Sequence, residues 1–247
     1  MSIPDIRRHA TARVAAVRIF EVGTLNLALT SDFPSTITNE LVARIRATAE
    51  KPRVAWIPPR TVAGRERFHA AQAQFQLLGV SAVEFCDIDE EPNEKQLAHL
   101  DEYDVLYFTG GDPLVFCANL KRWCVGDAVR KCLAAGRLVV GASGGAMQFG
   151  QNVSLYRLLS CDVERVLAER GEYTGLGLVD YELLPHLNRL DQPFLDKVAR
   201  YSEGVPQDVV ALEDGSAMIC TDRPEFRCVG RAARFRGGVR SPIEAAA

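Results

Sequence analysis

The sequence lacks several features that would place it in a specialised class of protein. No run approaches about 18 consecutive apolar residues, so no membrane-spanning helix is expected. The basic N-terminus is not followed by a long apolar segment, which argues against a secretory signal peptide. The net charge is only -3, too small for a surface that binds nucleic acid or anionic lipid. We therefore expect a cytoplasmic protein that has neither nucleic acid nor a membrane as a partner.

Cysteine is present, but the pattern of a metal site is missing. The seven cysteines include no C-x-x-C pair and no Cys/His spacing typical of zinc, so no metal is expected. Cys117, Cys124 and Cys132 are seven and eight residues apart, which matches one face of a helix. We expect these three cysteines to be reduced residues of the core.

The sequence does contain an alternation of strand and helix patterns. Hydrophobic residues make up 47% and charged residues 25% of the 247 residues, which suits a substantial core. From residue 25 to residue 143, apolar runs alternate with helical spacing. This predicts an α/β fold whose mostly parallel central sheet is flanked by helices. Later, short strands joined by turns predict a hairpin-rich C-terminal part. We predict one domain over residues 25–247, preceded by an arm or an extra strand at residues 1–24.

The turn "GASGG" at residues 141–145 follows the apolar run "RLVV" and matches the pattern G-x-S-x-G. In such a nucleophile elbow, a tight turn from strand to helix exposes the serine hydroxyl above the sheet. Glycines permit the turn because larger side chains would collide there. The alternative is a plain glycine-rich turn in which Ser143 has no chemical role.

A serine nucleophile needs a base, and the chain has only four histidines. His69 and His99 lie within helix patterns, and His9 lies in the N-terminal segment. His186 alone follows the serine in the chain, in a loop after the strand pattern "VDYELL". In an open parallel sheet, sites form beyond the carboxyl ends of the strands, where Ser143 and His186 are both predicted to lie.

The histidine in turn needs an acid that orients its ring. Asp214 follows another strand pattern and precedes a glycine, and Glu213 beside it is a rival. If the acid preceded the histidine, as in the α/β-hydrolases, the candidates would be Asp162, Glu164, Asp180 and Glu182. The alternative for Asp214 is a residue that only stabilises a turn.

A second glycine turn, "FTGGDP" at residues 108–113, also follows a strand pattern. Asp112 before Pro113 predicts a helix cap. The backbone N–H groups of Gly111 and Gly144 could together form an oxyanion hole. Phosphate binding is disfavoured because no Walker lysine and no G-x-G-x-x-G motif is present.

Taken together, five stretches resemble one family, the dipeptidase E (aspartyl dipeptidase) and cyanophycinase family of serine peptidases. The resemblance runs from about Leu27 to about Gly238 and rests on "RVAWIPP", "YFTGGDP", "GASGGAM", "GLGLVDYELLPHLNR" and "ALEDGSAM". It implies a fold like that of class I glutamine amidotransferases, with a flavodoxin-like three-layer arrangement. It also implies a triad of Ser143, His186 and Asp214.

The sequence departs from the family pattern at two positions. Gly144 stands where the family usually has alanine, and Asp214 stands where it usually has glutamate. These departures leave room for a non-catalytic relative that binds a small ligand or a partner.

The resemblance implies a dipeptidase or exopeptidase that cleaves small peptides, aspartyl peptides among them, through an acyl-enzyme and without a cofactor. An esterase or amidase and a cyanophycinase-like β-aspartyl peptidase are the alternatives. Arg60 and Arg189 are candidate substrate-binding residues, because guanidinium groups bind carboxylates in a bidentate manner. The expected partner is a small peptide, and a homodimer is left open.

Overall fold

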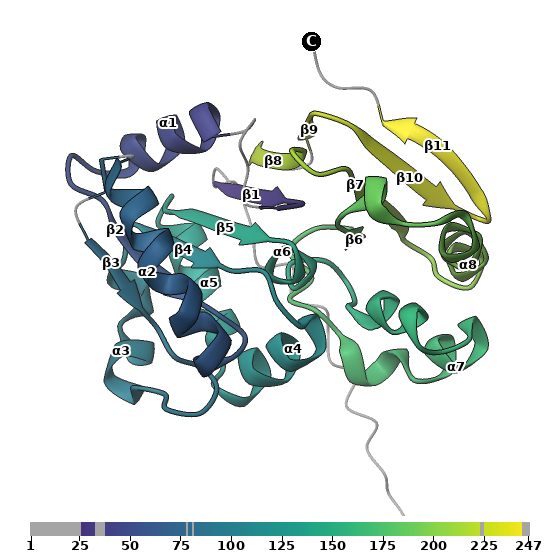
Figure 1. The fold of residues 1–247 in the computed structure, drawn as a ribbon, viewed down its shortest axis with the longest axis horizontal. Helices are drawn as coiled ribbons and strands as arrows, with labels where there is room; N and C mark the ends of the chain where they lie inside the picture. The colour runs from purple at the N-terminus through teal and green to yellow at the C-terminus, as the bar shows by residue number, and fades with distance from the viewer. Residues whose placement is uncertain (1–25, 33–37, 78, 81, 223–224, 244–247) are drawn as a thin grey trace, which may run out of the picture.

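The computed structural model describes residues 26–32, 38–77, 79–80, 82–222 and 225–243 (Figure 1). The predicted arm or extra strand at residues 1–24 lies outside this range. None of the helices in these segments is long and apolar enough to cross a membrane.

A seven-stranded sheet forms the centre of the fold, in the order β3-β2-β4-β5-β1-β8-β9. The strands from β3 to β1 are parallel, and β8 and β9 complete the sheet in antiparallel pairing. The strand bounds are Leu27–Thr30 for β1, Arg53–Ile57 for β2, Ala82–Phe85 for β3, Val105–Phe108 for β4, Leu138–Ala142 for β5, Ala217–Asp222 for β8 and Glu225–Val229 for β9. The predicted α/β fold with a mostly parallel central sheet is confirmed.

Helices cover both faces of this sheet, which explains why its strands are apolar without interruption. Successive residues point to opposite faces, so Ala28 packs with α1 and α2 while Leu27 and Leu29 pack with α4 and α5. The helix bounds are Thr38–Thr48 for α1, Thr61–Leu77 for α2, Glu94–Ala98 for α3, Pro113–Arg122 for α4 and Val125–Ala134 for α5, with the 3-10 helix η1 at Leu100–Glu102.

The expectation for the three cysteines is wrong at Cys124. Cys117 and Cys132 are buried, but Cys124 is exposed. The chain does not form one continuous helix here, because α4 ends and α5 begins around Cys124, whose φ of 51° is in the left-handed region. This break removes the helical periodicity that would have placed Cys124 on the buried face.

The C-terminal part forms a second sheet, in the order β11-β10-β7-β6, rather than hairpins alone. Strands β6 and β7 are parallel, and the other pairs are antiparallel. The strand bounds are Tyr181–Leu184 for β6, Asp208–Leu212 for β7, Ala232–Arg236 for β10 and Val239–Ile243 for β11. Figure 1 shows this sheet beside the central one, with α7 (Val163–Ala168) and α8 (Gln192–Glu203) next to it. The remaining elements are α6 at Gly144–Met147, η2 at Ser154–Leu159, η3 at Arg170–Tyr173 and η4 at Leu187–Arg189.

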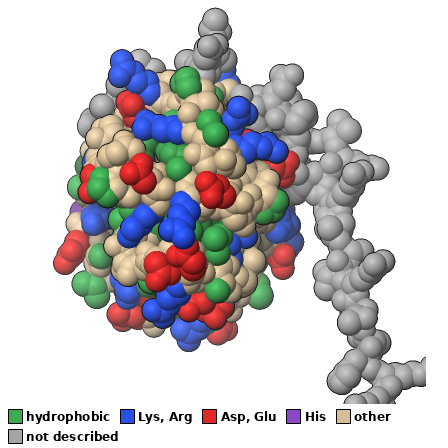
Figure 2. Space-filling view, turned by 90° about the vertical axis from the view of Figure 1, so that its right-hand side faces the viewer, with side chains coloured by type: hydrophobic (Ala, Val, Ile, Leu, Met, Phe, Trp, Pro, Cys, Tyr) green, Lys and Arg blue, Asp and Glu red, His purple; other side chains and the backbone are tan. Residues whose placement is uncertain are grey.

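The surface over the second sheet carries charges of both signs. Figure 2 shows arginine and lysine side chains interspersed with acidic ones on this face. Asp208 lies beside Arg236, with 3.1 Å between the charged groups, and 4.0 Å from Arg234. Such mixing gives this face no field of a single sign that would attract a polyanion.

A buried carboxylate lies in β6. The side chain of Glu182 is inaccessible to solvent and forms an ion pair with Arg170. It also accepts hydrogen bonds from Tyr201 at 2.8 Å and Gln207 at 2.6 Å. Burial raises the pKa of Glu182 above its ordinary value, although these partners act in the opposite direction. The four residues tie β6 to η3 and α8.

Replacing Arg170 with methionine is expected to lower the free energy of unfolding by about 3–5 kcal/mol at pH 7, because the buried carboxylate loses its counter-charge. The pKa of Glu182 would rise further in the folded state. The loss should therefore be larger at pH 7 than at about pH 4.5, near the pKa of free carboxyl groups, because protonation of Glu182 in the folded state relieves it. Urea unfolding at these two pH values measures the difference.

The matched control for this experiment is Arg200→Met, which removes the exposed pair with Glu164. It should cost less than about 1 kcal/mol. Equal losses for the two variants would contradict the assigned importance of the buried pair.

Candidate active site

Ser143 stands in a tight turn between β5 and α6. Its φ of 51° and ψ of -119° are unusual for a residue with a side chain. The turn packs directly against β4, because a Cβ on Gly145 would lie 2.4 Å from the carbonyl oxygen of Phe108. The glycines therefore let the turn approach the neighbouring strand, and the geometry has the form of a nucleophile elbow.

His186 and Asp214 follow two neighbouring strands of the second sheet. Because β6 and β7 are parallel, their carboxyl ends meet at one edge, and the residues just beyond those ends come together. The distance from Ser143 Oγ to His186 Nε2 is 2.9 Å, and that from His186 Nδ1 to Asp214 Oδ1 is 2.6 Å. The two sheets thus bring the three residues into one chain of hydrogen bonds.

Further residues hold the histidine and the acid in place. The buried hydroxyl of Ser31, which follows β1, accepts a hydrogen bond from the backbone N–H of His186 at 2.8 Å. It also lies 3.3 Å from Asp214 Oδ1. The backbone N–H of Asp214 donates to Asn188 Oδ1 at 2.8 Å. Our sequence reasoning missed Ser31 and Asn188; the position of Ser31 at the carboxyl end of a predicted strand was the available signal.

Arg189, a predicted substrate-binding residue, has its guanidinium bound to a carboxylate of the protein itself. Its guanidinium forms an ion pair with Oδ2 of Asp214, the oxygen that does not face His186. Burial alone would raise the pKa of Asp214. The hydrogen bonds and charges of His186 and Arg189 outweigh this and hold that pKa below its ordinary value. Asp214 therefore carries a negative charge between two positively charged or hydrogen-bonding partners.

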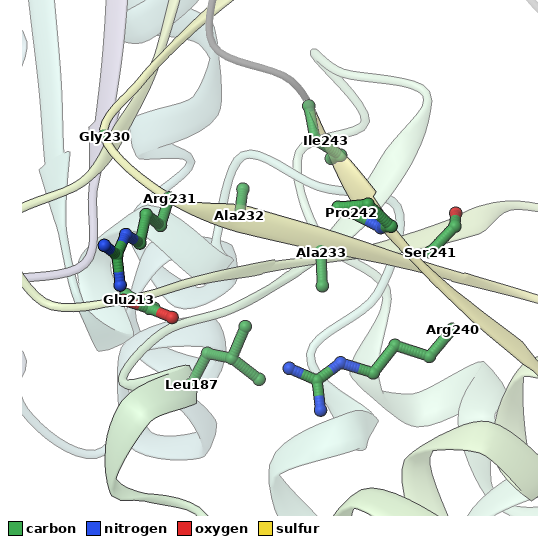
Figure 3. A pocket seen from close by; sticks show the side chains of 10 residues that line it. All are labelled: Leu187, Glu213, Gly230, Arg231, Ala232, Ala233, Arg240, Ser241, Pro242 and Ile243. Carbon is green, nitrogen blue, oxygen red and sulfur yellow. The ribbon is translucent and has the colours of Figure 1, made fainter.

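The rival acids lie away from His186. Asp180 is exposed and precedes β6, whereas His186 follows the opposite end of that strand. The side chain of Asp162 caps α7, Glu164 pairs with Arg200, and Glu182 is buried with Arg170. Glu213 lines a cavity of about 580 Å³ beside β10 and β11 (Figure 3). Asp214 is the carboxylate that the fold brings to the histidine ring.

The second glycine turn lies against the first. A Cβ on Gly110 would be 3.3 Å from the Cβ of Ser143, and one on Gly144 would be 2.0 Å from the carbonyl oxygen of Gly111. On its other side Gly111 contacts Pro59, whose Cγ would be 2.5 Å from an added Cβ. Asp112 caps α4 as predicted, accepting hydrogen bonds from the N–H groups of Leu114 and Val115.

Two cavities adjoin the serine turn and share Gly111. The cavity that contains Ser143 and His186 has a volume of about 110 Å³. The other has a volume of about 190 Å³, and Arg60 and Arg67 line it together with Asp112. Arg60 thus lies next to the glycine turn, in the cavity that does not contain Ser143. The 580 Å³ cavity is larger than both, but Ser143, His186 and Asp214 do not line it.

Fold and site together define a peptidase whose type is consistent with a serine nucleophile. The model of peptidase family S51 matches residues 27–225, and the chain belongs to this family. The predicted resemblance to serine peptidases is confirmed at this level.

Relatives of known sequence agree with this assignment. An uncharacterised peptidase of Listeria innocua is 29% identical over 167 residues, which cover 67% of this chain and 78% of the relative. An uncharacterised peptidase of Pasteurella multocida is 22% identical over 186 residues, covering 73% and 86%.

Two solved structures share the fold. A crystal structure of a peptidase from an acI-B1 actinobacterium superimposes with a TM-score of 0.70 at 18% identity, covering 90% of this chain and 94% of that one. The structure of a candidate peptidase E from Listeria monocytogenes gives a TM-score of 0.63 at 23% identity, covering 84% and 98%.

Proposed function

We propose that this protein is a serine exopeptidase of the dipeptidase type, acting on small peptides through Ser143, His186 and Asp214. The observation that carries the proposal is the continuous hydrogen-bond path from Ser143 Oγ through the imidazole to Asp214. A serine hydroxyl at the end of such a path can lose its proton as it attacks a carbonyl carbon.

The proposed reaction has two stages. Ser143 Oγ attacks the scissile carbonyl carbon while His186 Nε2 takes the hydroxyl proton, and Asp214 stabilises the resulting imidazolium. His186 then gives that proton to the leaving amine as the C–N bond breaks, which leaves an acyl-enzyme. In the second stage His186 takes a proton from water, the hydroxide attacks the ester, and Ser143 recovers its proton as the acid product leaves.

The glycine turns are the proposed electrostatic part of the site. We assign the backbone N–H groups of Gly111 and Gly144 to the oxyanion that forms when the carbonyl is attacked. Both turns lie next to Ser143. Arg60, which lines the adjoining cavity, is the proposed partner of a substrate carboxylate, with Arg67 beside it.

A fluorophosphonate probe tests the proposal, since it reacts with an activated serine whatever side chains the natural substrate has. We expect labelling at Ser143, together with faster turnover of dipeptides than of simple esters. Absence of labelling in a folded protein would favour a non-catalytic relative, and faster ester turnover would favour an esterase.

The ion pair between Arg189 and Asp214 allows the proposal to be tested through the pH dependence of kcat/KM. The guanidinium of Arg189 pairs with Asp214 and helps to hold the pKa of that carboxyl below its ordinary value, so replacing Arg189 with methionine should raise this pKa. The loss of kcat/KM on the acid side should then begin at a higher pH than in the unmodified protein. A pH–rate profile of the variant measures the shift.

Arg200→Met serves as the control, because Arg200 pairs on the surface with Glu164. It should leave the profile unchanged. If Arg189 instead bound the substrate carboxylate, its loss would raise KM and leave the acid limb in place.

A further inference from the structure

The cavity that contains Ser143 is lined mostly by apolar side chains. Its polar side chains are those of Ser143, His186 and Tyr156, and the two glycines of the turns also line it. The rest comes from two prolines and from five larger apolar residues: Met147, Leu159, Leu184, Leu190 and Phe194. Among the described residues that line it, none is Asp, Glu, Lys or Arg. The larger side chains come from α6, η2, the end of β6, the residue after η4 and the start of α8.

We infer that this cavity binds an apolar side chain next to the scissile bond, and that the preferred substrates are apolar rather than aspartyl at that position. The inference rests on the proposed peptidase function and adds the substrate class. It differs from what the family resemblance implied, because strong binding of an aspartyl carboxylate calls for a cationic partner, and no Lys or Arg is among the described residues that line the cavity.

The nearby arginines do not supply that partner. Arg189 is paired with Asp214, and Arg60 and Arg67 line the adjoining cavity. A carboxylate bound among Met147 and Phe194 would lose its hydration without gaining a counter-charge, which is strongly unfavourable. An aliphatic side chain would instead lose only its contact with water, which is favourable.

The size of the cavity narrows the choice of side chain. Its volume is about 110 Å³, whereas an engineered apolar cavity of about 150 Å³ is known to hold benzene. A branched aliphatic group such as that of leucine or valine is therefore the best match. Leu159, at the end of η2, is 57% exposed and so leaves one side of the cavity open toward solvent.

The adjoining cavity gives a charged group of the substrate a place apart from the apolar side chain. Gly111 lies on the border between the two cavities, next to the serine turn. A short peptide can thus place its apolar side chain beside His186 and a carboxylate near Arg60. This division is consistent with a substrate that has one apolar residue beside the scissile bond and a nearby chain terminus.

The test compares kcat/KM for two dipeptide series, in which Leu, Val, Phe or Asp is paired with Ala on either side of the bond. At one of the two positions, Leu or Val should exceed Asp by about 50-fold or more, as expected when a site lacks a partner for a charged group. A preference for Asp over the aliphatic residues at both positions would overturn the inference.

A charge placed at the rim provides a second measurement. Leu159→Lys should lower kcat/KM for the Leu substrate and raise that for the Asp substrate, so that their ratio falls at least about tenfold. The matched control is Val239→Lys on β11, which is 66% exposed and lies outside the cavity. An unchanged ratio in Leu159→Lys would also count against the inference.

Fluorophosphonate labelling separates this inference from the proposed function. A labelled enzyme that prefers Asp at both positions would keep the function and overturn the apolar site. A folded protein that neither reacts with the probe nor cleaves any dipeptide would overturn both.

Discussion

Replacing Ser143 with alanine is expected to lower kcat/KM by about 10⁴- to 10⁶-fold and to abolish fluorophosphonate labelling. The reason is the position of its hydroxyl, 2.9 Å from His186 Nε2 at the end of a path that leads to Asp214. Without the hydroxyl no acyl-enzyme can form. The remaining activity would come from binding and from the proposed oxyanion donors alone.

A double variant that combines Ser143→Ala with His186→Ala tests whether the two residues act together. If the two residues act as one unit, the double variant should be about as slow as either single variant, because the second substitution removes a group that has already lost its function. Steady-state kinetics of the three variants measure this non-additivity. Multiplied losses would show that the residues act independently.

The structure of these variants has to be checked as well. Ser143 has positive φ, so alanine there keeps a similar backbone cost, and the melting temperature should change little. Substantial activity in a well-folded Ser143→Ala protein would contradict the proposed nucleophile.

The second large effect is expected from Gly144→Ala. The added methyl group would lie 2.0 Å from the carbonyl oxygen of Gly111, well inside van der Waals contact. Gly111 cannot simply retreat, because its own Cα is packed against Pro59. The glycine turn that carries the proposed oxyanion donor must therefore shift, and kcat should fall by about 10²- to 10³-fold.

Gly171→Ala is the matched control for this substitution. A Cβ at Gly171 would meet no atom within 4 Å, so the variant should retain its activity. Labelling of Gly144→Ala by the fluorophosphonate probe should persist at a reduced rate, since Ser143 and His186 remain. A fully active Gly144→Ala enzyme would show that the position of the Gly111 turn does not limit the reaction.

This steric relation also explains the departure of the sequence from the family pattern. The resemblance leads to alanine at position 144, where the chain has glycine. With the Gly111 carbonyl oxygen in its present place, glycine is the residue that fits. The departure is thus a requirement of the local geometry and does not indicate a loss of function by itself.

The central sheet and the serine turn were predictable because their signals are local. Uninterrupted apolar runs such as Leu138–Ala142 indicate strands buried on both faces, and the glycines around Ser143 indicate a tight turn. The parallel pairing of β6 with β7 follows the same strand–helix–strand pattern, with α8 between the two strands. The sequence did not show that these strands leave the central sheet and form a second one with β10 and β11. The pairing of β6 with β7 places Asp214, rather than Glu213, beside the histidine.

The contacts around the acid were beyond sequence reasoning for another reason. Ser31 and Asp214 are 183 residues apart, and only the antiparallel addition of β8 to β1 brings their strands together. Arg189 was predicted to bind substrate, but its side chain reaches Asp214. Spacing along the chain does not reveal whether an arginine side chain binds a carboxylate of the substrate or one of the protein.

The two sheets contribute different residues to the site, so the alignment of these residues depends on how the two sheets pack together. Ser143 follows a strand of the central sheet, whereas His186 and Asp214 follow strands of the second sheet. A small displacement between the sheets would lengthen the distance from Ser143 to His186 while leaving His186 and Asp214 paired. The hydroxyl of Ser31, fixed to the central sheet and bonded to the His186 backbone, opposes that displacement. This hydrogen bond adds a polar link between two sheets that already share a hydrophobic core.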